Sequence, residues 1–244
     1  MVDIDEASSN GKLKRAILFL FFIIPKRILN LPKTIRLALL QRDWDAIDIH
    51  AKDAKGFTAL MEAIRLNSNE AADFLIRKGS DVNAESSMND TPLNLAARNN
   101  NVPMICSLIA SGANINGTAP PGLLTATPLI EAVRANAIES AQALIDHDAD
   151  LNGRGSIACM TPLMYAAENN ATEIANLLIR SGADVEAKTG SYIKTSALCF
   201  AAKSNAREMV ELLLVNNAKT KCLRAIKKEI PAEMLKWLKI KKVI

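Results

Sequence analysis

Residues 91–97 read Thr-Pro-Leu-Asn-Leu-Ala-Ala, and this stretch decides the fold because related stretches recur along the chain. The five copies begin at Thr58, Thr91, Thr127, Thr161 and Ser196, at intervals of 33, 36, 34 and 35 residues. A nearly fixed period of this size is typical of repeat architectures, in which each unit is one supersecondary element that stacks on the next. We therefore expect one elongated domain built from similar units.

Each unit contains signals for two helices. A Thr before Pro is a good helix N-cap, and Pro is tolerated at the first helical position, so each copy marks the start of a first helix. Apolar spacing such as that of Ile174, Leu177 and Leu178 predicts a second helix with one buried stripe. The units close on turns where a left-handed residue commonly ends a helix. Glycine stands there in three units, at residues 79, 112 and 182, whereas Asp148 and Asn217 replace it and predict the loosest turns.

These motifs resemble the ankyrin repeat, whose T-P-L-H-x-A-A signature and terminal G-A-D-x-N turn are matched over roughly residues 53–221. The resemblance implies an all-α ankyrin-repeat solenoid of helix-turn-helix repeats with finger turns and with helical N- and C-terminal caps. The fourth signature residue, usually His, is Met61, Asn94, Ile130, Met164 or Cys199. Hydrogen bonds that an imidazole would make between neighbouring repeats are therefore expected to be missing or altered.

The ends of the chain are expected to cap the solenoid, because an internal repeat exposes apolar surface when nothing stacks on it. Residues 35–52 are interpreted as an N-terminal capping half-repeat. Residues 222–244 are interpreted as a basic C-terminal cap or tail, in which Pro231 separates two short helices. Residues 1–34 form a basic and apolar segment before the repeats.

Residues 16–24 are apolar on every helical face, but nine residues span only half a bilayer core as a helix. Two interpretations stay open. One is a buried capping helix over the first repeat. The other is an interfacial anchor within residues 12–30, whose flanking cations meet anionic headgroups, which would make the protein a membrane-tethered adaptor. The basic C-terminal tail is either a second membrane contact or an export signal.

Composition favours thin, closely packed helices over a large sheet core, since 49% of residues are apolar and only 4% are aromatic. The four cysteines lie far apart without a CxxC pair, which argues against both a zinc site and a disulfide framework. We therefore expect an intracellular, cytoplasmic protein.

Charge is segregated along the chain. Residues 1–34 carry six Lys/Arg and three Asp/Glu, residues 219–244 carry nine and two, and the middle carries fifteen and twenty-one. The net charges of +3, +7 and −6 sum to the overall +4. A mildly acidic body with basic ends suggests that the ends meet an anionic membrane or a secretion receptor.

The sequence offers no catalytic constellation, which normally requires a nucleophile or base with a positioned partner. The two histidines, His50 and His147, fall in turns of distant repeats. Glycine-rich phosphate loops, GxSxG and HExxH are absent from the sequence, and the Asp-rich turn at residues 146–150 lacks the downstream Glu of a calcium loop. We expect no enzyme activity, no cofactor, no metal and no small-molecule substrate.

The family resemblance implies that a partner protein binds at the finger turns and at the concave ends of the first helices. One column of equivalent positions holds Arg65, Arg98, Arg134, Glu168 and Lys203, and a second holds Glu62, Leu95, Glu131, Tyr165 and Phe200. Apolar residues in the fingers, namely Met88, Leu123, Leu124 and Ile193, add a third candidate group.

Each column has an ordinary explanation as well. Glu62 with Arg65 and Glu131 with Arg134 are spaced as surface ion pairs, whereas Arg98 and Lys203 lack such a neighbour. The two aromatic residues either fill gaps between repeats or act as binding hot spots. We interpret the protein as a protein–protein interaction scaffold or adaptor, with a secreted bacterial effector as one version. The alternative of a nucleic-acid or phosphoinositide binder through the arginine column is disfavoured by the acidic middle segment.

Overall fold

The structure is a computed structural model that describes residues 48–117, 126–155, 159–190 and 194–244. Several predictions fall outside these ranges: the N-terminal segment, most of the capping half-repeat, and the finger residues Leu123, Leu124 and Ile193. The described residues form helices and turns, with two isolated β-bridges that join Lys52 to Thr58 and Gly155 to Met160.

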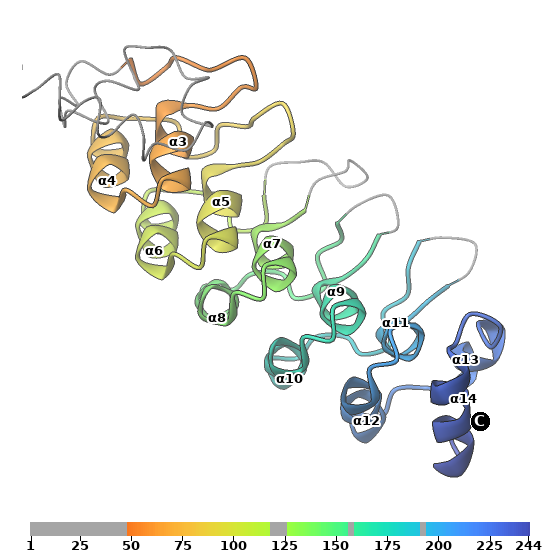
Figure 1. The fold of residues 1–244 in the computed structure, drawn as a ribbon. Helices are drawn as coiled ribbons and strands as arrows, with labels where there is room; N and C mark the ends of the chain where they lie inside the picture. The colour runs from red at the N-terminus through yellow and green to blue at the C-terminus, as the bar shows by residue number, and fades with distance from the viewer. Residues whose placement is uncertain (1–47, 118–125, 156–158, 191–193) are drawn as a thin grey trace, which may run out of the picture.

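Helices come in antiparallel pairs that step along one axis, and the described parts of the fingers lie on one side of the stack (Figure 1). The first helix of each pair has seven residues and the second has nine. The pairs are α3 (Ala59–Arg65) with α4 (Asn69–Arg77), α5 (Pro92–Arg98) with α6 (Val102–Ala110), α7 (Pro128–Arg134) with α8 (Ile138–Asp146), α9 (Pro162–Glu168) with α10 (Thr172–Arg180), and α11 (Ala197–Lys203) with α12 (Arg207–Val215). This arrangement confirms the all-α solenoid.

The first helices begin where the signature predicts. The hydroxyl oxygens of Thr58, Thr91 and Thr127 each accept a hydrogen bond from the backbone N–H three residues later, at 3.2–3.3 Å. Each bond satisfies a donor that the first helical turn leaves unpaired. Thr161 and Ser196 occupy the same extended N-cap position without that bond.

An asparagine ends the first helix in every pair, a signal that the sequence interpretation missed. It stands nine residues after each signature Thr or Ser, and its φ lies between 54° and 57° in all five copies: Asn67, Asn100, Asn136, Asn170 and Asn205. Asparagine tolerates this left-handed conformation better than most residues with a β-carbon. The second helices end on glycines of positive φ at 79, 112 and 182, and Asp148 and Asn217 adopt φ of 64° and 65° in the equivalent turns, which confirms the left-handed geometry.

The core runs between the two helical layers along the whole solenoid. The signature leucines are at most 1% exposed (Leu60, Leu93, Leu129, Leu163 and Leu198), and so are the leucines that face them from the second helices (Leu75, Leu108, Leu144, Leu178 and Leu213). Paired alanines beside the leucines allow the helices to approach closely. Burial of these side chains supplies the main driving force for stacking.

Neighbouring repeats are also joined by polar contacts at the closing turns. Asn83 Oδ1 accepts a hydrogen bond from the backbone N–H of Asn114 at 2.8 Å, and Asn116 Oδ1 accepts one from Asp150 at 2.8 Å. Asn152 with Asp184 and Glu186 with Lys219 continue this ladder. At the signature position, Asn94 Nδ2 donates to the carbonyl oxygen of Ala126 in the next repeat at 3.1 Å. The bonds expected from histidine are therefore altered, as predicted, and partly replaced.

The chain ends on two short helices, α13 (Lys221–Ala225) and α14 (Ala232–Ile240), which lie at the end of the stack beyond α11 and α12 (Figure 1). Apolar side chains from these helices and their linker are at most 5% exposed: Leu223, Ile226, Ile230, Met234 and Leu238. They cover the apolar flank that the fifth repeat would otherwise expose.

The sequence argues against a disulfide framework, but the described residues contain one disulfide. Cys199 on α11 and Cys222 on α13 form a disulfide, with their Cα atoms 6.4 Å apart. Their separation of 23 residues matches no familiar cysteine motif, so sequence spacing gave no hint of it. The pairing arises because α13 folds back onto α11, a contact that only the stacked structure reveals.

Within the described ranges, no helix combines the length and the apolar character needed to cross a bilayer.

Candidate protein-interaction surface

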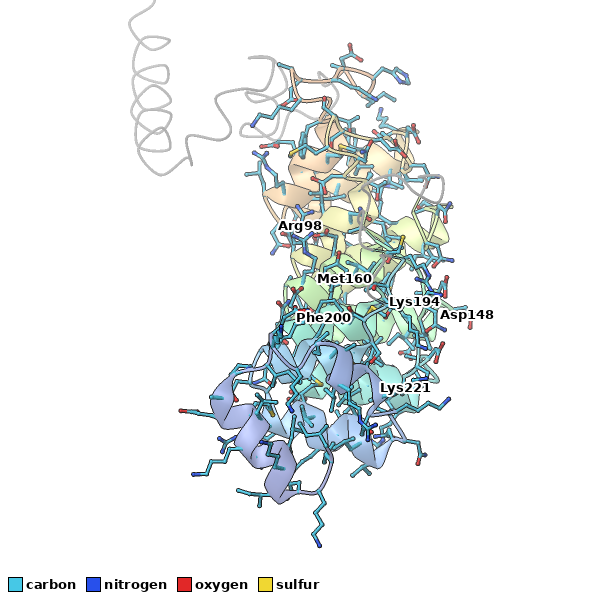
Figure 2. The ribbon with its side chains drawn as sticks, turned by 90° about the vertical axis from the view of Figure 1, so that its right-hand side faces the viewer. Arg98, Asp148, Met160, Lys194, Phe200 and Lys221 are labelled. Atoms are coloured by element: carbon cyan, nitrogen blue, oxygen red, sulfur yellow. A yellow bond between two sulfur atoms is a disulfide. The ribbon has the colours of Figure 1, made fainter. Side chains whose placement is uncertain are left out.

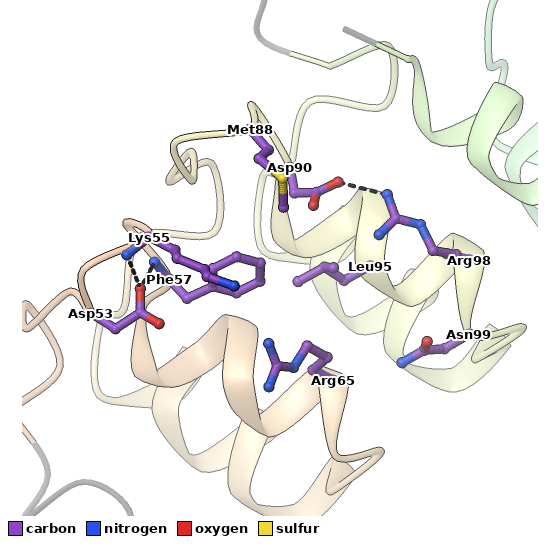
Figure 3. A pocket seen from close by; sticks show the side chains of 9 residues that line it. All are labelled: Asp53, Lys55, Phe57, Arg65, Met88, Asp90, Leu95, Arg98 and Asn99. Carbon is purple, nitrogen blue, oxygen red and sulfur yellow. Dashed lines mark hydrogen bonds and ion pairs between the residues drawn. The ribbon is translucent and has the colours of Figure 1, made fainter. Parts of the chain in front are cut away.

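A groove of about 400 Å³ opens between the first two repeats, on the side that carries the fingers. Its lining comes from two equivalent segments, Asp53, Lys55, Phe57 and Arg65 of the first repeat and Met88, Asp90, Leu95, Arg98 and Asn99 of the second. Phe57 and Leu95 point toward each other across its floor (Figure 3). Both are almost fully buried, at 4% and 3% exposure, so the floor is apolar and rigid.

Arg65 forms one wall of the groove. Its Nη2 donates to Glu62 Oε1 at 3.0 Å, and its guanidinium lies 5.4 Å from the centre of the Phe57 ring. The Glu62 side chain is only 2% exposed, and burial raises the pKa of this carboxyl although the charge of Arg65 opposes the rise. The ion pair and the ring together hold the Arg65 side chain in one place.

Arg98 forms the opposite wall and bridges two repeats. Its Nη2 lies 2.7 Å from Asp90 Oδ1, and its Nε lies 2.7 Å from Glu131 Oε2 on the next repeat (Figure 3 shows the first of these). Burial opposes the charge on Arg98, but the hydrogen bonds and charges of Glu131 and Asp90 outweigh it and raise its pKa. Charge-assisted bonds of this kind are short and strong, so they fix the relative position of the two repeats.

Every cation in the predicted column is ion-paired. The two pairs expected within helices are confirmed, Arg65 with Glu62 and Arg134 with Glu131, although their carboxylates are buried rather than on the surface. Arg98 and Lys203 have no acidic residue three positions before them, but both pair with carboxylates that lie farther away in the sequence. Arg98 has the two carboxylates described above, and Lys203 Nζ lies 2.5 Å from Glu229 Oε2 of the cap. Because these partners are distant in sequence, helical spacing does not reveal them.

This pairing changes what the column can bind. The side chains of the four cations are between 27% and 55% exposed, so they remain reachable at their tips. Their charges, however, are largely compensated by their carboxylate partners, which are buried for the three arginines and half-exposed for Lys203. A phosphate-rich ligand would have to compete with those carboxylates, which further disfavours the nucleic-acid and phosphoinositide alternative.

The two aromatic residues of the second column, Tyr165 on α9 and Phe200 on α11, are each partly buried and pack against the core. They occupy equivalent positions on helices that contact each other. Figure 2 places Phe200 along the same edge of the solenoid as Arg98. Each ring therefore packs between repeats and is also partly open to solvent, and a role as a binding hot spot stays a prediction.

The other predicted contact residues differ in exposure. Met88 is 65% exposed at the tip of its finger, whereas Leu95 is 3% exposed and contributes to the groove floor rather than to a protruding surface. Glu168 is exposed at the end of α9. The described residues thus bring Arg65, Met88, Leu95 and Arg98 together in one groove, and place Arg134, Tyr165, Phe200 and Lys203 farther along the solenoid.

The two histidines lie in separate turns of the described chain. His50 precedes α3 and His147 follows α8, and the Nδ1 atom of His147 lies 2.8 Å from the backbone oxygen of Ala143. In these ranges no group of three or more His, Cys, Asp or Glu side chains is placed to hold a metal ion.

Comparison with known proteins agrees with the repeat pattern. The family model described as "Ankyrin repeats (3 copies)" matches residues 28–119, 88–155 and 121–189, which together cover about two thirds of the chain. A search of the curated proteins gave no match. Ankyrin repeats generally mediate protein–protein interaction, and proteins of this family are typically non-enzymatic scaffolds. The recurring signature, the stacked helix pairs and the family match lead to one conclusion: the chain belongs to the ankyrin-repeat family.

Proposed function

We propose that the protein is an interaction scaffold or adaptor that binds an extended segment of a partner protein in the groove between its first two repeats. The observation that carries the proposal is Met88, a large apolar side chain that is 65% exposed beside an apolar floor made of Phe57 and Leu95. Exposed apolar side chains at the rim of a preformed groove are typical of protein-binding sites.

The charges around the groove support a polypeptide ligand. Lys55 and Asp53 stand on the first finger, and Asp90 and Arg98 stand on the second repeat, so both signs are present within one small site. A peptide backbone offers donors and acceptors in equal number, and its side chains can supply an apolar anchor for the floor. Arg65 and Arg98 are already fixed by Glu62 and by Asp90 and Glu131, so little side-chain entropy is lost on binding.

The test compares two matched variants of the full chain. Met88→Glu places a charge at the groove, and Val215→Glu places the same charge at the end of α12, where the native valine is 80% exposed. Both sites are open to solvent, so both variants should melt at the wild-type temperature. Candidate partners captured by wild-type protein are then purified, and their affinity for the three proteins is measured by calorimetry.

A genuine groove partner binds Met88→Glu at least about tenfold more weakly than wild type, because a hot-spot side chain is replaced by an ill-suited charge. The same partner binds Val215→Glu with wild-type affinity. Equal affinity for all three proteins would exclude this groove as the binding site, and the half of the surface around Tyr165 and Phe200 would be examined next.

A further inference from the structure

We propose that the outer face of the C-terminal cap is a docking surface for anionic phospholipid bilayers. The surface, termed here the basic end face, consists of the exposed cations Lys221, Arg224, Lys227, Lys228, Lys236, Lys239 and Lys242. None of these seven side chains forms an ion pair with another residue of the described ranges. This distinguishes them from the cations of the groove side, whose charges are compensated by buried carboxylates.

The geometry of α14 places an apolar side chain among the lysines. Met234 and Leu238 are fully buried and fix which side of the helix faces the fifth repeat. Successive residues of a helix are turned by about 100°, so Lys236, Lys239 and Ile240 lie on the opposite side. Ile240 is 69% exposed. An exposed apolar side chain on the same side of a helix as Lys236 and Lys239 suits partial insertion among lipid headgroups.

The C-terminal end also differs in charge from the repeat body. Residues 219–244 have a net charge of +7, whereas residues 35–218 have a net charge of −6. Two other cations of residues 219–244 form ion pairs within the protein, Lys219 with Glu186 and Lys241 with Glu211. An anionic surface would therefore attract this end and repel the body, which favours an orientation with the cap toward the membrane.

The chemistry of the side chains favours lipid over nucleic acid. Six of the seven cations of the basic end face are lysines, which act as hydrated point charges, and only Arg224 has the planar fork that recognises phosphates in a bidentate manner. Trp237 is half-buried, with the ammonium group of Lys241 at 5.6 Å from its ring, so it does not offer a free stacking platform. Ile240 has no role against a sugar-phosphate backbone.

The proposed membrane contact is independent of the proposed partner site. The groove lies between α3 and α5, at the opposite end of the described solenoid from α14 (Figure 1). A protein docked by its cap would keep the groove open to a partner.

Vesicle binding by the full chain tests the proposal. The vesicles contain either phosphatidylcholine alone or phosphatidylcholine with about a third phosphatidylserine, and sedimentation measures the bound fraction. The cap variant is Lys236→Gln/Lys239→Gln. The matched control is Arg77→Gln/Arg180→Gln, which removes the same charge from exposed positions on the body. Each lysine near an anionic surface contributes roughly fivefold to binding, so the cap variant should bind the anionic vesicles about 30-fold more weakly than wild type.

The control should bind within about twofold of wild type, and Ile240→Gln should bind several-fold more weakly without a change in salt dependence. Wild-type binding by the cap variant would overturn the proposal, and so would equal binding of wild type to neutral and anionic vesicles. A 20-base-pair DNA duplex is the second probe, and binding to it without binding to anionic vesicles would assign the end face to nucleic acid instead. Met88→Glu leaves vesicle binding unchanged, so failure of the groove proposal and failure of this one are distinguishable.

Discussion

At the scale of single residues, the repeats depend on backbone positions that few side chains tolerate. Asn205 follows α11 with a φ of 57°, and its side chain is exposed. It is one of the simplest of the five equivalent asparagines to substitute, because among the described residues its side chain makes no hydrogen bond.

We expect Asn205→Val to lower the free energy of unfolding by about 1–2 kcal/mol, because a β-branched residue is strongly disfavoured in the left-handed region. Asn205→Gly should change it by only a few tenths of a kcal/mol, since glycine adopts this conformation without strain. Urea denaturation of both variants measures the difference. Equal stability of the valine and glycine variants would contradict a local backbone requirement.

A second residue-scale prediction concerns pH. Burial raises the pKa of Glu62 above its ordinary value of 4.5, and a nearby Asp53 raises it further against the opposing charge of Arg65. A carboxyl with a raised folded pKa contributes stability below its unfolded pKa and loses that contribution as pH rises through the folded pKa. The stability of wild type relative to Glu62→Gln should therefore fall as pH rises above 4.5.

Glu139 provides a control, because its contribution to folding stability should change with pH in the opposite direction. A hydrogen bond from Asn100 lowers the pKa of this exposed carboxyl, so its contribution is present above its ordinary pKa of 4.5 and is lost as pH falls through the lowered value. The stability of wild type relative to that of Glu139→Gln should therefore fall at acid pH. Parallel thermal melts at a series of pH values measure both differences, and the same sign for both variants would refute the assignment.

At the scale of helices, the packing between repeats includes aromatic side chains that are buried on one side and open to solvent on the other. Tyr165 on α9 and Phe200 on α11 are partly buried at equivalent positions of adjacent first helices. We expect Tyr165→Ala and Phe200→Ala each to cost roughly 1–3 kcal/mol of stability, less than the 3–5 kcal/mol typical of a fully buried aromatic ring.

Denaturant titration of the two variants and of Tyr165→Phe checks this, with the conservative variant expected near wild type. A cost near zero would show that the rings only cover the surface, and a cost above about 4 kcal/mol would show that they belong to the core proper.

At the scale of the whole molecule, a helical cap covers the C-terminal end of the stack. Apolar packing and a disulfide hold this cap in place. Buried side chains such as Leu223 and Leu238 hold α13 and α14 against the fifth repeat. The disulfide between Cys199 and Cys222 joins α11 to α13. Because each repeat of a solenoid is stabilised mainly by its neighbours, a loosened cap weakens the fifth repeat first.

We therefore expect Cys222→Ser to lower stability by about 3 kcal/mol, the loop-closure entropy of a crosslink that spans a loop of this length. Cys106→Ser removes an exposed free thiol and should have no effect. Peptide mapping without reductant, with thermal melts of both variants, measures the outcome. Recovery of the Cys199 and Cys222 peptides as free thiols from the folded, oxidised protein would refute the crosslink.

The sequence alone determined the family, the two-helix unit and the starts of the first helices. These features depend on local interactions. Thr58 caps α3 by accepting a hydrogen bond from the backbone N–H three residues later, and signature leucines such as Leu60 recur with the period of the repeat. The candidate site was only partly predictable. Arg65 and Met88 were identified from their positions in the repeat, and both line the groove.

The tertiary structure decided the rest, because it brings together residues about one repeat apart. Glu131 lies 33 residues from Arg98 and neutralises it, which no helical spacing predicts. Leu95 shares a repeat position with Tyr165 and Phe200, yet it is buried while they are partly exposed. The repeat motif determines the backbone position of each side chain. The size of the side chain and the residues packed beside it in the neighbouring repeats determine whether it reaches solvent.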